Sequence, residues 1–527
     1  MKKTQSRFFR ALPWLIAAFA YLTTMLLIAA KGRPYLDSDM SSEMVLANLL
    51  NQEGGLLSAN WWYSTELRVF YLQIFYRLGL LLFPQDWFMA RVFGQALWML
   101  TLFAAYIYMA RGMGLTQSGA WGVAALACPF GAWYFWYGAY SGFYLPNMIL
   151  ILFSLGAALR LLKPKAGVRR AVQWAILALA CFVAGLSSMK TLMAMFLPLP
   201  VAAAAMAARE FRKNGAFGET KRLLIVSVIA SAIAFFGYLI NAAVLTKRYS
   251  YIGSGVEMFS AFGIDDFLSS ISRFFALFGY PADSYWDTNI RVLSIPGVLG
   301  AFGILTALAI AVSLVRLLKR SDTLSVPERL APVLLLSMIL VEGMIFTVTG
   351  GWANGAYWLL VVPFAFPVLQ LEVETERVRL PQMRKIAALG LCVCLFATSA
   401  TSVFILFRRG MRTDERLMAA AEELDARGYT QGYATPWHGN AVTEWTSGRV
   451  EVWTTIDFST GEALHWLQSK SHEQPPEGRV FVLATMGELE EAGAAALADS
   501  PNRVYTDGEY VILDFENAEA MKRAFSA

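Results

Sequence analysis

The sequence predicts an α-helical polytopic membrane protein with about eleven transmembrane helices and a small extracytoplasmic α+β domain at its C-terminus. Three observations support this fold class. Of the 527 residues, 57% are hydrophobic and only 16% are charged, whereas a soluble globular protein has about 25% charged residues. Long apolar runs recur along the chain. Lys and Arg gather in alternate short connections between these runs.

The apolar runs define the expected spans. The first run follows the basic leader MKKTQSRFFR and is longer than the apolar core of a cleaved signal peptide, so we expect an uncleaved first span. The runs that reach or approach the length of a membrane-spanning helix cover residues 11–30, 87–109, 117–137, 143–162, 171–187, 191–208, 223–245, 293–318, 331–349, 356–371 and 386–407.

The charges of the short connections predict the topology. Alternate connections are rich in Lys and Arg, as in residues 160–170 and 209–222, whereas SGFYLPN and TGGWANGAY contain neither. The positive-inside rule therefore places the N-terminus in the cytoplasm. An odd number of spans then places the C-terminal domain outside. The net charge of +5 reflects this topology and gives no indication of nucleic-acid binding.

Two domains follow from this arrangement. We expect a transmembrane domain over residues 1–407, with long outer loops at 31–86 and 246–292, and an extracytoplasmic α+β domain over 408–527. In the first loop, TELRVFYLQIFYRLGLLLF predicts an amphipathic helix at the membrane interface, because its two arginines make it a poor span. In the second loop, DDFLSSISRFFALFGY has apolar residues at helical spacing.

The C-terminal domain is more polar than the rest of the chain. DERLMAAAEELDARG predicts a helix closed by Gly428, and the next 28 or so residues predict short strands with turns at HGN and SGR. GRVFVLAT and EYVILDF predict two further strands, with a second helix near residues 487–498. All three histidines, His438, His465 and His472, lie in this domain without metal-ligand spacing, so we expect structural roles for them. The four cysteines lie in apolar runs and indicate no disulfide framework.

The acidic stretch PYLDSDMSSEMVLANLL directly follows the first span. One serine separates Asp37 from Asp39, and Glu43 lies one helical turn beyond Asp39. If the stretch is helical, Asp39 and Glu43 therefore share a face. A purely structural role is open for Asp39, which would cap the N-terminus of this helix. A catalytic role is the alternative.

The first 115 residues resemble the GT-C superfamily of membrane glycosyltransferases, which includes the protein O-mannosyltransferases and the lipid A aminoarabinose transferases. The resemblance rests on the acidic motif LDSDMSSEMVLANLL, the amphipathic stretch STELRVFYLQIFYRLGLLLF and the second span DWFMARVFGQALWMLTLFAAYIYMARGMG, which opens with an apolar-Ala-Arg stretch. It implies a GT-C-like fold and the transfer of a sugar from a polyprenyl phosphate to an acceptor outside the membrane, with inversion favoured. The family's catalytic acid falls on Asp39, with Asp37 as the alternative.

Two departures from the family pattern concern the acid and the phosphate. Met40 stands where a Glu often follows the family acid. Near the C-terminal spans, GGWANGAYWLLVVP offers Tyr357 without the Arg of the usual basic-aromatic pair. Recognition of the donor phosphate therefore has to draw on other cations.

The chemistry of such a transfer requires a base and a positive charge. A hydroxyl that attacks an anomeric carbon must lose its proton, and a carboxylate within hydrogen-bond reach can take it. The charge of the departing phosphate is balanced by Lys, Arg or a divalent metal. Asp37 and Asp39 can hold Mg²⁺ or Mn²⁺ through oxygen ligands if the enzyme is metal-dependent, but the sequence makes no cofactor certain.

Lys190 and Arg68 are the candidate ligands of the donor phosphate. Lys190 lies in the very short outer link GLSSMKT, where a cation needs a partner. Snorkelling of Lys190 to the interface is the alternative. Arg68 is the second choice and has a simple surface ion pair with Glu66 as its alternative. Glu342, inside an expected span, is a further functional hypothesis.

Supporting roles are expected for Glu43, Asp287 and Tyr357. Asp287 belongs to GYPADSYWD, one of several aromatic clusters in the outer loops. Aromatic rings in these clusters can stack on a sugar, or they can form the interfacial belt that many membrane proteins carry.

We therefore expect an integral membrane glycosyltransferase that moves a sugar from a polyprenyl-phosphate-linked donor to a glycan, lipid or protein acceptor on the outer face of the cell membrane, in the assembly or modification of the cell envelope. The alternatives are a transporter or flippase of lipid-linked glycans and a non-catalytic membrane scaffold. A transporter should show paired broken spans and a polar site at the membrane midplane. The expected partners are the donor, the acceptor and membrane lipids, with no nucleic acid.

Overall fold

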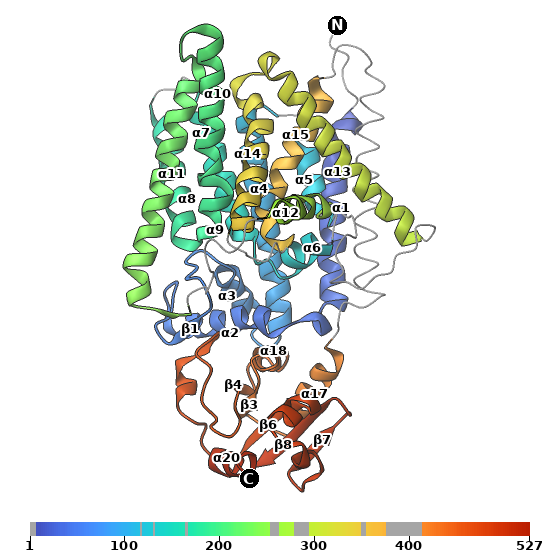
Figure 1. Ribbon diagram of the computed structural model, residues 1–527. Coiled ribbons are helices and arrows are strands. Elements are labelled where there is room, and N and C mark those ends of the chain that lie inside the picture. Colours follow the sequence, from blue (N-terminus) through green and yellow to red (C-terminus); the bar gives the residue numbers. More distant parts are fainter. Residues whose placement is uncertain are drawn as a thin grey trace. The chain divides into compact units, whose positions relative to one another are not determined.

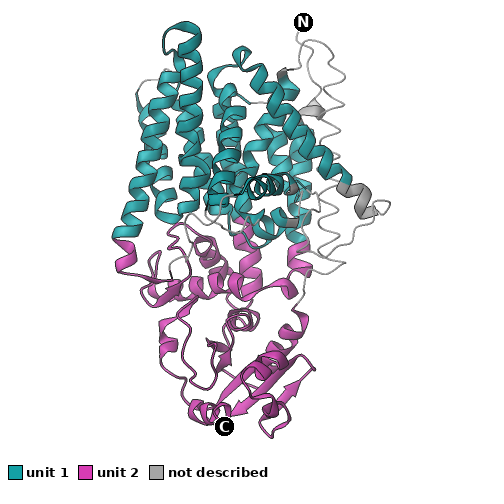
Figure 2. Ribbon diagram, in the orientation of Figure 1, with its two compact units in different colours: residues 1–26, 98–243, 255–411 teal, residues 27–97, 244–254, 412–527 magenta. Residues whose placement is uncertain are grey.

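The computed structural model describes residues 7–115, 119–129, 132–163, 167–252, 263–278, 295–348, 355–375 and 414–527. These residues form a mainly helical protein with a sheet-containing region near the C-terminus (Figure 1). They group into two compact units, shown in Figure 2. Unit 1 comprises Met1–Leu26, Trp98–Ala243 and Gly255–Met411, and unit 2 comprises Leu27–Leu97, Val244–Ser254 and Arg412–Ala527.

Unit 1 is built from helices, two of which, α1 and α4, also extend into unit 2. Their bounds are α1 Arg7–Lys31, α4 Trp87–Met113, α5 Gly119–Ala127, α6 Ala132–Tyr134, α7 Leu145–Leu161, α8 Val168–Ser187, α9 Met189–Thr191, α10 Pro198–Asn214, α11 Glu219–Ala243, α12 Ile264–Ala276, α13 Ile295–Lys319, α14 Val326–Val348 and α15 Ala365–Thr375. Helix α12 is the one expected in the second outer loop.

Seven described helical segments are long and apolar enough to cross a membrane, which agrees with a multi-pass protein. They are Ala11–Lys31, Trp87–Met113, Val168–Ser187, Met189–Asn214, Glu219–Lys247, Ala301–Lys319 and Val326–Val348. The predicted total of about eleven is therefore not confirmed.

The remaining expected spans are short, broken or outside the described residues. The apolar run 117–137 divides into α5, α6 and a π-helical turn, since Pro129 lies just past the end of α5. Helix α7 has 17 residues, and the run 356–371 begins with two 3₁₀ turns before α15. The run 386–407 lies outside the described residues.

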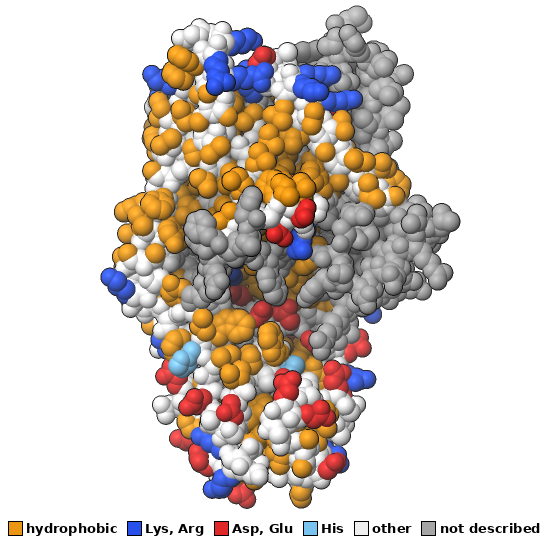
Figure 3. All heavy atoms as spheres, in the orientation of Figure 1, with side chains coloured by type: hydrophobic (Ala, Val, Ile, Leu, Met, Phe, Trp, Pro, Cys, Tyr) orange, Lys and Arg blue, Asp and Glu red, His pale blue; other side chains and the backbone are white. Residues whose placement is uncertain are grey.

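Three basic connections that the positive-inside rule assigned to one side of the membrane lie together in unit 1. They include residues 160–170, 209–222 and 316–329. Arg209 and Lys213 both form ion pairs with Asp322, each at 3.3 Å. The Arg222 guanidinium donates to the carbonyl oxygen of Leu162 at 2.9 Å. Lys and Arg side chains gather at this end of unit 1 in Figure 3. The predicted alternation of loops is therefore consistent with the packing of the helices.

Unit 2 combines the predicted first outer loop with the predicted C-terminal domain. Its elements are a 3₁₀ turn Arg33–Tyr35, α2 Ser38–Glu53, β1 Trp61–Tyr63, α3 Gln73–Leu82, β2 Ser250–Tyr251, α17 Glu415–Ala426, β3 Gln431–Ala434, α18 Gly439–Trp445, β4 Glu451–Thr454, β5 Gln468–Ser469, β6 Val480–Thr485, α19 Met486–Glu491, β7 Arg503–Thr506, β8 Tyr510–Phe515 and α20 Ala518–Phe525. These strands form a three-stranded sheet and a five-stranded sheet.

The five-stranded sheet has the order β4-β3-β6-β8-β7. Strands β4, β3 and β6 are parallel, with Tyr433 opposite both Trp453 and Val482, and the β6-β8 and β8-β7 pairs are antiparallel. The side chains of Tyr433, Val482, Leu513 and Met521 are fully buried in its core. Because a helix-flanked sheet of this kind can bury its own apolar face, the predicted α+β character of the tail is confirmed.

The three-stranded sheet joins segments that are far apart in the sequence. β1 pairs in parallel with β2 and antiparallel with β5. Trp61 and Tyr63 of β1 pack with Leu46 and Leu50 of α2 in a small apolar cluster. This cluster holds β1 against α2.

Two predicted local elements differ from the structure. The HGN stretch was expected to form a turn between strands, but it opens α18, because the seven residues after His438 are all buried and pack on α2 and β4. The amphipathic helix of the first outer loop is limited to Gln73–Leu82. The residues just before α3, 65–72, form bends and turns between the end of β1 and this helix.

The tight packing of α8 against α11 in unit 1 depends on glycine. A Cβ atom on Gly185 would lie 1.8 Å from the carbonyl oxygen of Ala234, and one on Gly237 would lie 2.2 Å from that of Phe182. We expect Gly185→Ala to lower the stability of the detergent-solubilised protein by about 1–3 kcal/mol, because the backbones must separate. Ala175→Val, at an exposed position of α8, should leave the thermal unfolding temperature unchanged. Equal unfolding temperatures for both variants would contradict this packing argument.

Candidate functional site

Asp37 and Asp39 lie at the start of α2, and they have different structural roles. Asp37 is the N-cap residue, and its Oδ1 accepts a hydrogen bond from the backbone N–H of Met40 at 2.7 Å. Asp39 lies in the first helical turn with its side chain exposed. Its backbone carbonyl oxygen accepts a hydrogen bond from the Ser42 hydroxyl at 2.7 Å, whereas its carboxylate makes no hydrogen bond or ion pair with the described residues. The expectation that Asp39 would be the cap was wrong, because Ser38 already begins the helix.

The carboxyl groups of this region are harder to ionise than ordinary acids. Burial and the nearby charge of Asp39 raise the pKa of Asp37 to about 7, although the Met40 hydrogen bond and the charge of Arg91 oppose the shift. Burial also raises the pKa of Glu43 to about 7, against the charges of Arg68 and Arg91. Surrounding protein raises the pKa of Asp39, and Arg68 again opposes this. Carboxyls with such pKa values can exchange protons near neutral pH.

A hollow in unit 2 lies beside these acids. Its empty volume is about 320 Å³, part of it open to solvent. Its lining residues come from α2, from β1 and the irregular segment after it, from the start of α3, and from the chain just before β5: Ser42, Glu43, Leu46, Trp61, Tyr63, Ser64, Glu66, Arg68, Tyr71, Gln73 and Leu467. We call it the Glu43 hollow.

Arg68 connects the hollow to the acids of α2. Its Nε lies 3.3 Å from Glu66 Oε2, and its guanidinium carbon lies 4.5 Å from the centre of the Tyr71 ring. Its charge also acts on Asp39 and Glu43. Arg68, predicted to bind the donor phosphate, therefore interacts with several acids. The ion pair with Glu66, which was the structural alternative for Arg68, is present.

A fully buried ion pair, which the sequence analysis did not identify, supports α2. Arg91 of α4 binds Glu444 of α18 through two hydrogen bonds, Nε to Oε1 at 2.7 Å and Nη2 to Oε2 at 2.6 Å. Arg91 also donates to the Met40 carbonyl oxygen at 2.7 Å and to the Tyr76 hydroxyl at 3.2 Å. Side-chain exposure is 2% for Arg91 and 0% for Glu444. The apolar-Ala-Arg stretch was the only signal of this arginine in the sequence.

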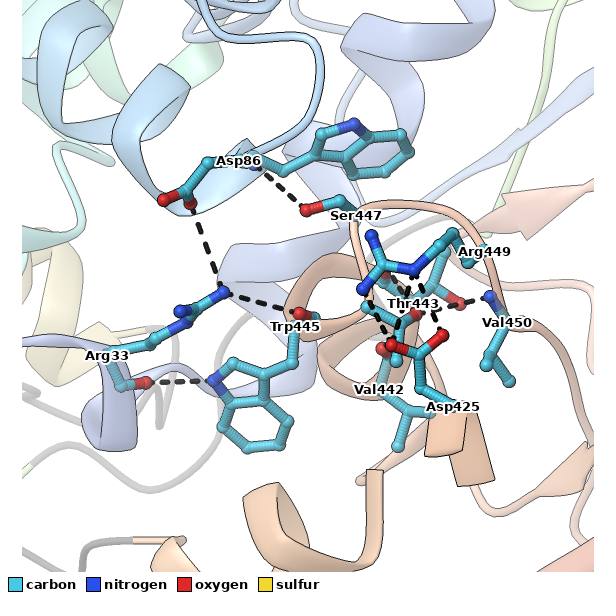
Figure 4. Close-up of polar contacts among 11 residues, drawn as sticks. Arg33, Asp86, Asp425, Val442, Thr443, Trp445, Ser447, Arg449 and Val450 are labelled. Atoms are coloured by element: carbon cyan, nitrogen blue, oxygen red, sulfur yellow. Dashed lines mark hydrogen bonds and ion pairs between the residues drawn. The ribbon is translucent and has the colours of Figure 1, made fainter. Parts of the chain in front are cut away.

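Further polar contacts surround α18, as Figure 4 shows. The indole N–H of Trp445 donates to the carbonyl oxygen of Arg33 at 2.9 Å, and the Arg33 side chain forms an ion pair with Asp86 at 4.0 Å. The backbone N–H of Trp87 donates to the Ser447 hydroxyl at 3.2 Å. In addition, the backbone N–H of Asn440 donates to the Ser38 hydroxyl at the start of α2. A helix of the C-terminal domain therefore helps to position the acid-bearing helix.

Lys190 occupies a different environment, in unit 1. It lies on the short helix α9, with its ammonium nitrogen 4.9 Å from the ring centre of Tyr357 and 5.7 Å from that of Tyr144. The two tyrosine rings pack edge to face at 6.5 Å. Lys190 also acts electrostatically on Glu342, which is buried in α14. The structure thus brings together Lys190 and Tyr357, which the sequence analysis had chosen separately.

Asp287 and a bound metal are the remaining expectations for the site. Asp287 lies outside the described residues. For a metal, no group of three His, Cys, Asp or Glu side chains gathers in ligand geometry within the described ranges. Because the Asp37 carboxylate is also occupied by its capping hydrogen bond, these residues do not fit a resident Mg²⁺ or Mn²⁺.

Comparisons by sequence and by structure give different results. No protein-family profile matches the sequence, and no curated protein matches it significantly. Among solved structures, ArnT from Cupriavidus metallidurans bound to undecaprenyl phosphate matches with a TM-score of 0.59 and 11% identity, over 97% of this chain and 98% of that one. ArnT in the apo state matches with a TM-score of 0.54 and 13% identity, over 94% and 98%.

A more distant match is the oligosaccharyltransferase AglB from Archaeoglobus fulgidus in complex with an inhibitory peptide and a dolichol-phosphate. Its TM-score is 0.48 at 13% identity, over 94% of this chain and 71% of that one. Both ArnT, a lipid A aminoarabinose transferase, and AglB are GT-C superfamily membrane glycosyltransferases. The likeness to ArnT extends over nearly the full length of both chains. The GT-C-like fold expected from the first 115 residues is thereby confirmed.

The Arg91–Glu444 pair gives a stability prediction. We expect Glu444→Gln to destabilise the protein by about 3–5 kcal/mol, because it leaves the Arg91 charge buried without a counter-charge. The matched control is Asp425→Asn, which removes a surface ion pair with Arg449 of 2.7 Å and should cost about 0–1 kcal/mol. Thermal unfolding of both purified variants in detergent tests this difference. A Glu444→Gln variant as stable as the control would show that the buried pair does not hold unit 2 together.

The raised pKa of Glu43 gives a prediction on pH. The folded state keeps the Glu43 proton up to about pH 7, whereas the unfolded chain releases it near pH 4.5, so folded protein binds more protons between these values. This contribution to stability is complete below the unfolded pKa and is lost as pH rises through about 7. We expect Glu43→Gln to flatten the fall in unfolding temperature between about pH 5 and about pH 8. Parallel curves for variant and wild type would contradict the shift.

Proposed function

We propose that the protein is an integral membrane glycosyltransferase that moves a sugar from a polyprenyl-phosphate-linked donor to an acceptor on the outer face of the cell membrane. The observation that carries this proposal is the unengaged Asp39 carboxylate at the start of α2, beside Arg68 and the Glu43 hollow, on a GT-C-like fold. The solved ArnT with that fold was crystallised with undecaprenyl phosphate. The acceptor is a glycan, lipid or protein of the cell envelope.

Asp39 serves as the general base in this proposal. Its carboxylate accepts the proton of the acceptor hydroxyl as the oxygen attacks the anomeric carbon, and the bond from that carbon to the phosphate oxygen breaks. Direct displacement inverts the anomeric configuration. The polyprenyl phosphate leaves as a stable anion, so a second protein acid is not needed to protonate it. The raised pKa of Asp39 makes its carboxylate a better base than an ordinary aspartate.

Asp37 acts mainly on the geometry of the site. Its cap fixes the first turn of α2, and with it the position of Asp39. The negative charges of Asp37 and Asp39 repel each other, so ionisation of one carboxyl disfavours ionisation of the other. Asp37 remains the alternative base.

Lys190 is the proposed ligand of the donor phosphate. A lysine ammonium binds phosphate as a point charge, and the rings of Tyr144 and Tyr357 restrict where this charge can lie. Arg68 is less suited to this role than the sequence suggested, because Glu66 and the acids of α2 compete for its guanidinium.

The topology proposed here follows the charges of the connections. The N-terminus lies in the cytoplasm, and the C-terminal domain, residues 408–527, lies outside together with the outer loops. Such an arrangement places the acids of α2 on the side where a lipid-linked sugar and an envelope acceptor would meet.

Replacement of Asp39 tests the proposed function. We expect Asp39→Asn to lower the transfer rate by about 10²–10⁴-fold, because the amide cannot accept the hydroxyl proton. The assay uses the purified full-length protein with a panel of labelled polyprenyl-phosphate sugars and envelope extract as acceptor. Asp499→Asn, at a surface position with a 90% exposed side chain, is the control and should transfer as wild type.

Asp37→Asn separates the two acids, since asparagine also caps helices well and should preserve α2. Loss of transfer in Asp39→Asn alone assigns the base to Asp39, and loss in Asp37→Asn alone assigns it to Asp37. Wild-type rates in both variants would overturn the glycosyltransferase proposal and favour a transporter or a scaffold.

A further inference from the structure

A carboxyl group lies inside one of the apolar helices of unit 1. Glu342 belongs to α14, which is among the described helices long and apolar enough to cross a membrane, and the residue is 3% exposed. No hydrogen bond joins its carboxyl group to a residue that the structure describes. An acidic side chain at membrane depth is costly, and such side chains usually face an internal polar site and pair with another charge.

The packing of α14 brings Glu342 toward Lys190. Phe346 lies four residues after Glu342, so the two side chains share one face of the helix. The Phe346 ring packs against the Tyr357 ring with their centres 5.7 Å apart, and the centre of the Tyr357 ring is 4.9 Å from the Lys190 ammonium nitrogen. Helix α14 also packs on the π-helical turn Leu192–Phe196, which directly follows α9 and its lysine.

Lys190 supplies the charge opposite to that of Glu342. It is the one charged residue in the described part of the chain that acts electrostatically on the Glu342 carboxyl group. Where α12 approaches α14 at Gly343, the nearest side chains are those of Phe267 and Ile271, which are apolar. The ammonium and the carboxylate therefore stabilise each other in surroundings that offer little other compensation for charge.

A donor phosphate and the Glu342 carboxylate compete for the same ammonium group. A phosphate that binds Lys190 has the same sign of charge as Glu342. The carboxyl group must then either stay ionised near a second anion or bind a proton, and both outcomes oppose phosphate binding. The repulsion grows with the charge of the phosphate.

The proposed transfer raises the charge of the lipid phosphate. In the donor this phosphate is a diester, linked to the sugar and to the polyprenyl chain, and it carries a single negative charge. When the bond from the anomeric carbon to the phosphate oxygen breaks, the oxygen keeps the electron pair. The product is a monoester with a charge of about −1.5 to −2 at neutral pH. A lysine without a neighbouring acid would therefore bind the spent carrier more tightly than the donor.

We propose that Glu342 is a positioning residue of the Lys190 phosphate site and that its carboxyl group promotes release of the spent polyprenyl phosphate. It holds the Lys190 ammonium when the site is empty, and it opposes the product more than the less charged donor. This inference rests on the proposed function, because it takes Lys190 as the ligand of the donor phosphate. It deepens that function by assigning product release to a residue within the membrane.

Binding of undecaprenyl phosphate to the full-length protein in detergent tests the role of Glu342. Glu342→Gln removes the competing charge, so we expect undecaprenyl phosphate to bind about three- to tenfold more tightly than to wild type. Lys190→Met should bind it more weakly. Adding Glu342→Gln to Lys190→Met should change nothing further, because the lysine through which Glu342 acts is absent. Undecaprenol, which lacks the phosphate, should bind equally to wild type and to Glu342→Gln.

Three further variants separate the effect of charge from an effect on folding. Glu342→Asp keeps the charge and should bind undecaprenyl phosphate as wild type does. Glu342→Met removes the charge a second time at similar volume and provides the same measurement if the Gln variant does not fold. Glu372→Gln is the matched control, because Glu372 is another buried glutamate of unit 1 and pairs with Arg316 at 3.3 Å. It should bind undecaprenyl phosphate as wild type.

Transfer kinetics give a second readout. Added undecaprenyl phosphate should inhibit Glu342→Gln more strongly than wild type by about the same three- to tenfold factor. The kcat should fall, because release is slower, while the KM for the donor should not rise.

The outcomes distinguish this inference from the proposed function. Unchanged or weaker binding of undecaprenyl phosphate by Glu342→Gln, equal tightening for undecaprenol, or tightening that persists in the Lys190→Met background overturns the role of Glu342. Wild-type binding by Lys190→Met overturns the phosphate site itself and this inference with it. Neither result changes the Asp39→Asn test, which decides the transferase function.

Discussion

The buried ion pair of Arg91 and Glu444 is the constraint on which unit 2 depends. Both side chains have lost their hydration, so each charge is stabilised by the other and by the neighbouring Met40 carbonyl and Tyr76 hydroxyl. The two residues are 353 positions apart in the sequence. The first turn of α2, which carries the acids, is therefore positioned by a helix of the C-terminal domain, and that domain is part of the site's architecture.

Local features of the chain were predictable because they depend on nearby residues. Helix α17 ends before Gly428, which has the positive φ of +74° that glycine adopts easily, and β6 and β8 follow the predicted apolar stretches. The acidic motif was recognised from Asp37, Asp39 and its place after the first span. The GT-C-like fold was inferred from these early residues and is confirmed over nearly the whole length of the chain.

Long-range features of the site were not predictable, because sequence spacing carries no information on which distant groups meet. Nothing in the tail marked Glu444 as the partner of Arg91, since an isolated glutamate in a turn-like stretch is an ordinary surface residue. The capping role of Asp37 depended on where α2 begins, and helix boundaries vary by a residue or two. The approach of Lys190 to Tyr357 likewise arises from tertiary packing of segments that periodicity treats as separate.

The small sheet β2-β1-β5 has a consequence for biosynthesis. Its strands come from residues 61–63, from residues 250–251 and from residues 468–469, and the ribosome delivers them in that order. When β1 emerges, neither neighbouring strand has been synthesised. Likewise, Glu444, the counter-charge of the Arg91 that binds the Met40 carbonyl of α2, has not yet been made. Maturation of the acidic region is thus coupled to completion of the polypeptide. A stalled or prematurely terminated nascent chain would carry the carboxylates without the scaffold that arranges them.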